Sequence, residues 1–178
     1  MVVAGVLGWV NSITKDKIAA ITWEKTVTAM KEVISADDFS DAMDLTDDMT
    51  AAATAQGGTL AAVYQAQSGG QPIGYAINVE SSGSQGTISM MVGIDMDGAV
   101  TGVSIVTNSE TSGIGSKVMG NEPLTNGTGV LDQFIGKSAA DGTLSVGSNV
   151  DAITGATVST KGVTTGVNAA LAVAGVIG

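Results

Sequence analysis

Apolar residues in the first part of the chain recur with the spacing of an amphipathic helix. Successive members of the set are three or four residues apart, so they fall on one side of a helix. The set comprises Ala20, Trp23, Val27, Met30 and Ile34. The spacing predicts a helix from Thr14 to Ile34 that packs by one face.

Beyond residue 58 the hydrophobic period changes to the alternation of a β-strand. Four alternating runs follow one another, over residues 60–66, 73–79, 88–94 and 100–106. The sequences between them are typical of turns and include Gly69-Gly70-Gln71-Pro72 and Asp95-Met96-Asp97-Gly98. Asp95 and Asp97 could also be metal ligands, but their place between two alternating runs favours a turn. We therefore predict a four-stranded antiparallel meander as the central sheet.

Both ends of the chain are apolar. Residues 158–177 carry one charge, Lys161, and the uncharged tail from Gly162 is 17 residues long, short of the roughly 20 that span a bilayer. A helix buried against the sheet is therefore favoured there. The uncharged block over residues 2–10 fits either the end of a longer membrane helix, with Trp9 at the bilayer surface, or a short buried helix or frayed terminus.

These patterns predict a single α+β domain, in which a central antiparallel sheet is flanked by an N-terminal and a C-terminal helix. A length of 178 residues suits one domain. Six aspartates between residues 37 and 48 lack the Gly and Glu placement of a calcium loop, so we expect a solvated acidic loop. The expected divisions are a helix and acidic linker over residues 14–57 and the main domain over residues 58–178.

Charge and composition exclude several functional classes. Seventeen acidic residues against seven basic ones give a net charge of −10, which opposes binding to nucleic-acid phosphates. The chain has no Cys and no His, which excludes thiolate or imidazole metal sites, a Cys nucleophile and a Ser-His-Asp triad. We expect no catalytic side chain and no metal. Either the protein only binds, or a group attached to it reacts.

One segment carries candidate chemistry, where a loop gives way to the last predicted helix. It is Asp151-Ala152-Ile153-Thr154-Gly155-Ala156-Thr157-Val158-Ser159-Thr160. Small neighbours leave the Thr157 hydroxyl open, and a helix N-terminus offers backbone N–H groups and a positive dipole end to a phosphate. From the residues alone, this is a helix cap that could bind an anion. Dinucleotide and P-loop functions are excluded, because neither G-x-G-x-x-G nor G-x-x-x-x-G-K-[ST] is present.

The segment resembles the D-x-x-[ST]-G-A-T signature of the FMN-binding domain family, found in the G subunit of the Rnf complex and the C subunit of the Na⁺-translocating NADH:quinone reductase. Residues 92–98 followed by Glu110-Thr111-Ser112-Gly113-Ile114-Gly115 are similar, in the same order, to the family's strand, turn and H-x-E-T-P-G-L-G segment. Asn108, Ser112 and Ile114 depart from the family's His, Pro and Leu, and Ser84-Gln85 interrupts a G-Y-G-G-like stretch. Both glycines of the loop are kept.

The resemblance implies a covalent FMN, joined by its phosphate to Thr157 through a phosphoester that a separate flavin transferase makes from FAD. It further implies that Thr154, Gly155 and Ala156 hold the phosphate end and that the upstream loop contacts the flavin. The loop residues concerned are Glu110, Thr111, Gly113, Ile114 and Gly115. The cofactor would carry the electrons, while the protein orients it.

The implied function is that of an electron-transfer flavoprotein subunit in a membrane ion-pumping complex of the Rnf type, a ferredoxin:NAD⁺ oxidoreductase. The isolated domain would turn over no substrate, and its partners would be the other membrane subunits. Residues 1–13 would be the remnant of a single N-terminal transmembrane anchor, with the FMN domain on the extracytoplasmic side of the cell membrane. Two alternatives stay open: the C subunit of the quinone reductase, and a free-standing extracellular flavin-binding electron shuttle.

Overall fold

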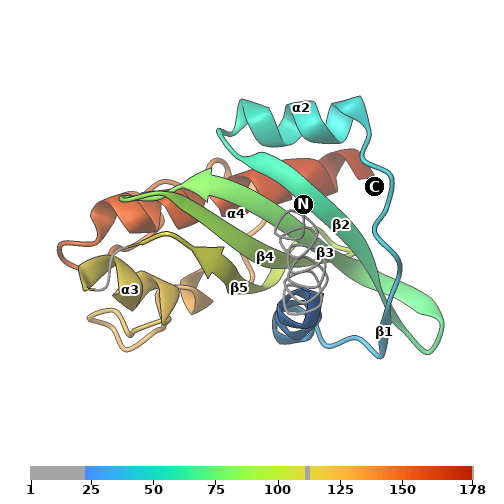
Figure 1. Ribbon diagram of the computed structural model, residues 1–178, viewed down its shortest axis with the longest axis horizontal. Coiled ribbons are helices and arrows are strands. Elements are labelled where there is room, and N and C mark those ends of the chain that lie inside the picture. The colour runs from blue at the N-terminus through green and yellow to red at the C-terminus, as the bar shows by residue number, and fades with distance from the viewer. Residues whose placement is uncertain (1–22, 111–112, 178) are drawn as a thin grey trace, which may run out of the picture.

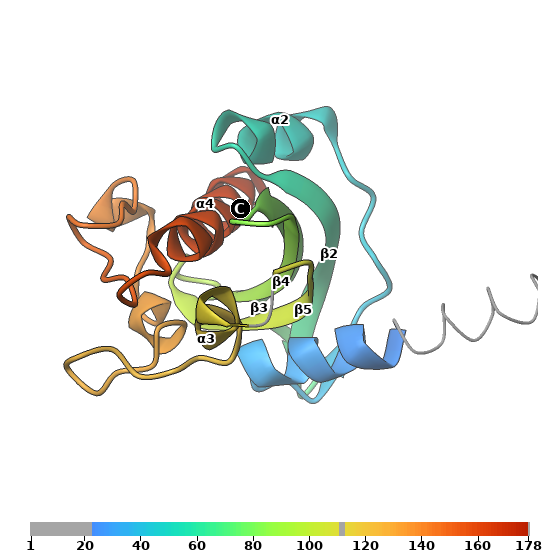
Figure 2. The same cartoon turned by 60° about the vertical axis from the view of Figure 1, so that its left-hand side comes forward.

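The computed structural model describes residues 23–110 and 113–177, and it forms one domain around a curled sheet (Figures 1 and 2). A helix over residues 23–33 comes first. The elements that follow, in chain order, are β1 (Asp38–Phe39), α2 (Asp47–Ala55), β2 (Thr59–Ser68), β3 (Gln71–Ser82), β4 (Thr87–Asp95), β5 (Val100–Asn108), α3 (Ile114–Met119), the 3₁₀ helices η1 (Asp132–Phe134) and η2 (Ala139–Asp141), and α4 (Thr157–Ile177).

The sheet is antiparallel throughout, with the strand order β1-β2-β3-β4-β5. The predicted meander of four strands, now β2 to β5, is confirmed. At the turn between β4 and β5, one carboxylate oxygen of Asp95 accepts hydrogen bonds from the backbone of Asp97, at 3.0 Å, and of Ala99, at 2.9 Å. Asp95 therefore stabilises this turn, as its sequence predicted.

The acidic segment contains structure that the sequence analysis missed. Its six aspartates are exposed, as expected, but β1 adds a fifth strand by pairing with β2, and α2 begins within the segment. The Thr46 hydroxyl caps α2 by accepting a hydrogen bond from the Met49 backbone at 3.2 Å, and Asp47 and Asp48 occupy the first helical turn, where negative charge is favourable. The segment is thus only partly a loop.

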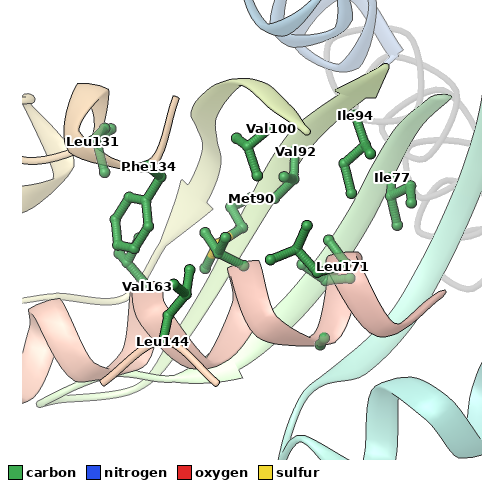
Figure 3. Close-up of a cluster of buried hydrophobic side chains, with 14 of the residues drawn as sticks. Ile77, Met90, Val92, Ile94, Val100, Leu131, Phe134, Leu144, Val163 and Leu171 are labelled. Carbon is green, nitrogen blue, oxygen red and sulfur yellow. The ribbon is translucent and has the colours of Figure 1, made fainter. Parts of the chain in front are cut away.

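The larger core fills the concave side of the sheet, where α4 lies (Figure 2). Alternate residues of β4 point into it, namely Met90, Val92 and Ile94, while Met91 belongs to a cluster on the other face. Phe134 of η1 and the helical residues Val163 and Leu171 meet these strand residues (Figure 3). The core therefore joins the sheet, α4 and the irregular segment over residues 120–150.

The second cluster lies on the opposite face of the sheet. It joins Met30, Val33 and Ile34 to strand residues that include Tyr64 and Met91. The described part of the predicted helix over residues 14–34 thus packs by one face. The rest of that helix and the expected anchor over residues 1–13 lie outside the described residues, so the complete flanking arrangement stays a prediction.

The predicted C-terminal helix is present as α4. It is long and apolar enough to cross a membrane by length and composition, but 56% of its most apolar window is buried inside the protein. Its buried residues include Gly162, Val163, Gly166 and Val167, so small side chains face the sheet. Such burial is typical of the core helix of a globular domain. Because α4 packs against the sheet, the position of its first turn relative to the sheet is set.

Candidate functional site at the start of α4

A tight turn precedes the exposed first residue of α4. Gly155 has a φ of +84°, which favours glycine, and Ala156 is buried. The Ala156 carbonyl accepts hydrogen bonds from the backbone of Thr160, at 2.9 Å, and from its hydroxyl, at 3.0 Å. Thr157 then opens the helix with an exposed side chain.

The first turn of α4 has the electrostatic character of an anion site. The first N–H groups of any α-helix have no acceptor within the helix, and the aligned peptide dipoles leave partial positive charge there. Thr157, which is exposed, therefore lies beside donors that favour a phosphate. These local N–H donors favour an anion even though the net charge of the whole chain is negative.

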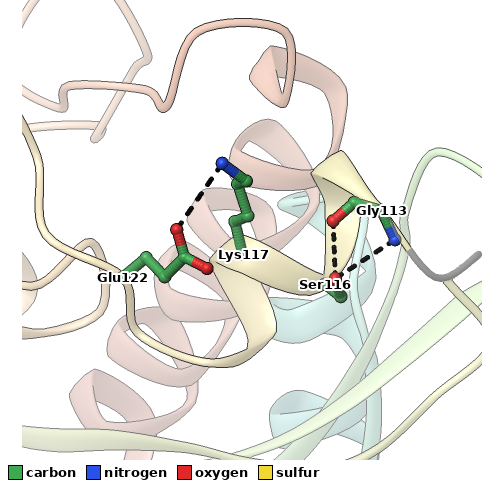
Figure 4. A network of polar contacts seen from close by, with 4 residues as sticks. All are labelled: Gly113, Ser116, Lys117 and Glu122. Atoms are coloured by element: carbon green, nitrogen blue, oxygen red, sulfur yellow. Dashed lines mark hydrogen bonds and ion pairs between the residues drawn. The ribbon is translucent and has the colours of Figure 1, made fainter.

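The predicted cofactor loop leads from β5 into α3. Gly113 precedes the helix with a φ of +140°, and, in the part of the chain that the structure describes, no atom beyond its chain neighbours lies within 4 Å of the position that a Cβ would take there. The Ser116 hydroxyl donates to the Gly113 carbonyl at 2.5 Å and accepts from its N–H at 3.3 Å, while Lys117 and Glu122 form an exposed ion pair (Figure 4). The loop thus presents an open stretch of backbone at Gly113.

A carboxylate joins this loop to α4. The hydroxyl of Ser159, which is 1% exposed, donates to Oε2 of Glu110 at 2.6 Å. The backbone N–H of Gln85 donates to Oε1 at 3.1 Å. Burial raises the pKa of Glu110, but the hydrogen bonds from Ser159 and from the backbone over residues 84–86 outweigh it, so this pKa is lowered from 4.5.

The predicted residues fall into two groups that α4 brings together. Thr154, Gly155 and Thr157 are exposed at its start, and Glu110 contacts Ser159, two residues beyond Thr157. Gly115 lies beside both partners of that contact, because a Cβ there would be 2.5 Å from Glu110 Oε2 and 3.2 Å from Ser159 Oγ. Thr111 and the side chain of Ile114 lie outside the described residues.

Two site residues were missed by the sequence analysis. Ser159 lies in the quoted segment, just beyond the family signature, but it was given no role, because its partner is 49 residues away and no sequence period indicates that contact. Gln133 holds the backbone of Asp151 at the start of the motif. The only sequence signal for Gln133 was its position as a polar residue next to Phe134 in an apolar stretch. That signal is too weak to predict a role.

One groove of the molecule lies away from this site. A groove of about 450 Å³ lies between the helix over residues 23–33 and β5, lined by Glu24, Lys25, Glu32 and Ile105 among others. Among the described residues, no group of three or more His, Cys, Asp or Glu side chains could hold a metal ion. The candidate site is therefore the start of α4, where the motif residues lie close to the hydrogen bond between Glu110 and Ser159.

Comparison with known proteins places the same region in a family. A model of the FMN-binding domain matches residues 83–172, which include both the loop and the start of α4. The G subunit of the Na⁺-translocating ferredoxin:NAD⁺ oxidoreductase complex of Acetobacterium woodii is 34% identical over 183 residues, covering 97% of this chain and 84% of that protein. The G subunit of the ion-translocating oxidoreductase complex of Methanosarcina acetivorans is 29% identical, over 96% of this chain and 86% of that protein.

A third relative matches a shorter stretch. It is the G subunit of the proton-translocating ferredoxin:NAD⁺ oxidoreductase complex of Clostridium ljungdahlii, which is 36% identical over 112 residues. That alignment covers 61% of this chain and 57% of the relative. These three relatives are thus all named as G subunits. The translocated ion is named as Na⁺ in the first and as the proton in the third, and the name of the second specifies no ion.

Proposed function

The chain belongs to the FMN-binding domain family, and from that premise we propose that it is the G subunit of an Rnf-type ion-translocating ferredoxin:NAD⁺ oxidoreductase, with FMN joined covalently to Thr157. The observation that carries the proposal is the exposed residue Thr157 at the first turn of a largely buried helix, near a loop with a left-handed backbone at Gly113. FMN, when bound, supplies electron-transfer chemistry that the side chains of this chain lack.

The residues present fit the phosphate end of this cofactor. A phosphoester at Thr157 would lie at the first-turn N–H groups of α4, where the dipole stabilises negative charge. The turn at Thr154 and Gly155 is exposed, so it leaves room for a second protein to reach the hydroxyl. Attachment by a flavin transferase that uses FAD forms a bond between Thr157 Oγ1 and the FMN phosphorus, while AMP leaves and the hydroxyl proton is released.

The residues also fit a flavin near the loop. Gly113 has a φ of +140°, and among the described residues no atom other than those of its chain neighbours lies within 4 Å of the position that a Cβ would take. The proposal assigns flavin contacts to the loop from Thr111 to Gly115. The protein would thereby orient the flavin and shield one side of it, while electrons enter and leave through partner subunits.

The proposal extends to location and partners. The names of the relatives support a subunit of a membrane-associated complex. We place the FMN domain on the extracytoplasmic side, with residues 1–13 as the end of a membrane anchor and the other subunits of the complex as partners. The C subunit of the quinone reductase and a free-standing shuttle are less favoured, because the relatives reported above are all named as G subunits.

Intact-mass analysis after co-expression with a flavin transferase tests the attachment. We expect the mass to rise by one FMN less one water, and in-gel flavin fluorescence to persist after denaturation. Thr157→Ala should abolish both signals, whereas Thr128→Ala, at an exposed loop position, should leave them intact. A full mass increase in the Thr157→Ala protein would place the flavin elsewhere. Purification from the native membrane would then identify the partner subunits.

A further inference from the structure

The Glu110 carboxylate accepts hydrogen bonds from two separate parts of the chain. The Ser159 hydroxyl, from the first turn of α4, donates to Oε2 at 2.6 Å. The Gln85 backbone, from the turn between β3 and β4, donates to Oε1 at 3.1 Å, and the neighbouring backbone groups of Ser84 and Gly86 also donate to this carboxylate. Both carboxylate oxygens are therefore engaged by the protein itself.

Two glycines make room for the same carboxylate. A Cβ at Gly83 would collide with Oε1, and a Cβ at Gly115 would come within 2.5 Å of Oε2. Gly83 belongs to the turn after β3 and Gly115 to the first turn of α3. The backbone of two segments, the turn after β3 and the start of α3, thus approaches one carboxylate closely. This packing is a separate observation from the hydrogen bonds.

We propose that Glu110 is a positioning residue, whose carboxylate fastens the turn over residues 84–86 and the start of α3 to the first turn of α4 and so sets the flavin loop against Thr157. This inference rests on the proposed function, since it assigns Glu110 to holding the flavin site rather than to touching FMN. An ionised carboxylate suits the task because it only accepts hydrogen bonds, and every hydrogen-bond partner named above is a donor.

The substitutions that test the proposal follow from this donor pattern. Glu110→Gln keeps the shape but turns an NH₂ group toward a hydroxyl or N–H donor. Ser159→Ala removes one donor and leaves the backbone partners in place. Glu122→Gln is the matched control, because Glu122 is an exposed carboxylate on the neighbouring segment and pairs with Lys117 at 3.7 Å.

Three measurements separate positioning from general stability. The first is the rate of FMN attachment at limiting flavin transferase, followed by intact mass. The second is hydrogen exchange at the Gln85 amide in the protein before flavin is attached. The third is the visible circular dichroism of the attached flavin, recorded well below the unfolding temperature, which a purely structural role would not change.

Loss of one charge-assisted hydrogen bond should slow attachment and speed Gln85 exchange by about tenfold in Glu110→Gln. Ser159→Ala should slow attachment by a smaller factor, and the double variant should be no slower than Glu110→Gln alone. The flavin dichroism should change in both single variants and match the wild type in Glu122→Gln. If Glu110→Gln does not fold, the Ser159→Ala measurements alone test the proposal, because that variant keeps the backbone donors to Glu110.

The outcomes distinguish this inference from the proposed function. Wild-type protein that takes up no flavin, or that takes it up without Thr157, overturns the proposed function. Normal loading at Thr157 in wild type, together with unchanged attachment rate, Gln85 exchange and flavin dichroism in both Glu110→Gln and Ser159→Ala, overturns the positioning role alone.

Discussion

The side-chain amide of Gln133 pairs with the backbone of Asp151 as the peptide group of a neighbouring strand would. The Asp151 N–H donates to Gln133 Oε1 at 2.8 Å, and Gln133 Nε2 donates to the Asp151 carbonyl at 2.9 Å. A further bond, to the Val130 carbonyl at 2.8 Å, orients the same amide. Because Phe134 beside it is buried in the core, this pairing connects the core to the segment that leads into Thr157.

Gln133→Ala should therefore loosen the approach to α4. Its three hydrogen bonds are partly exposed, so we expect a loss of about 1–2 kcal/mol in the free energy of unfolding, measured by urea denaturation. Flavin attachment at Thr157 should also slow, since the motif backbone is less ordered. Gln71→Ala, at an exposed position in the β2–β3 hairpin, is the control. Equal effects of the two substitutions would contradict a specific role for Gln133.

Gly113→Val should alter the attached flavin. We expect the cost to arise from its φ of +140°, because no described atom beyond its chain neighbours lies within 4 Å of the position that a Cβ would take. A β-branched residue would force the loop backbone to change, at about 1–3 kcal/mol, and so shift the flavin absorbance or reduction potential. Gly127→Val is the matched control, since Gly127 also has a positive φ, of +85°, and open space.

Both variants should lose stability, and only Gly113→Val should change the flavin. Identical absorbance spectra and potentials for Gly113→Val and wild type would show that this loop is remote from the cofactor.

Stability should fall at acid pH partly through Glu110. Its pKa is lowered in the folded state from an ordinary value of 4.5, so its contribution is present above pH 4.5 and is lost as pH falls through the lower folded value. The unfolding temperature of Glu110→Gln should therefore depend less steeply on pH below about 4.5. Asp37, whose pKa is lowered by Ser68 and Gly69, adds a similar dependence, which Asp37→Asn should remove.

Thermal unfolding between pH 3 and pH 7, roughly the range over which carboxylates titrate, measures both effects. Parallel curves for wild type and Glu110→Gln across that range would mean that the carboxylate gains nothing from its neighbours.

The sequence predicted elements whose period is set by one buried face. In β4, Met90, Val92 and Ile94 alternate because every second residue meets α4, so the strand was visible from the pattern alone. β1 was missed because a strand of two residues is too short to show an alternation of apolar and polar positions. In α2 only Met49 and Ala53 are buried, so its apolar face is too narrow to stand out, although its cap and first-turn aspartates were present.

The candidate site was predictable only in part, for a related reason. A local signature at Thr157 is contiguous in sequence, so it could be found by inspection. The tie between Glu110 and Ser159 depends on how the sheet curls and on where α4 enters it, and it spans 49 residues. Such contacts follow from tertiary packing, which hydrophobic periodicity does not encode.

Two glycines of α4 provide a final comparison, with the same substitution in the same helix. A Cβ at Gly162 would lie 2.6 Å from the Ser82 carbonyl oxygen and 3.2 Å from the Gly83 Cα, whereas nothing lies within 4 Å of a Cβ at Gly175. The Ser81 hydroxyl also donates to the Gly162 carbonyl at 2.8 Å in a buried position. Helix and hairpin therefore touch through backbone at Gly162.

Gly175→Ala should stabilise the protein by up to about 1 kcal/mol, because alanine is the better helix former. Gly162→Ala gains the same propensity but must push the hairpin away, at a cost of about 1–3 kcal/mol, so we expect net destabilisation in urea denaturation. Displacement of Gly83 would also disturb the turn that binds Glu110, so flavin attachment should slow only in Gly162→Ala. Equal stabilisation by both substitutions would mean that α4 and the β3–β4 hairpin lie further apart than described.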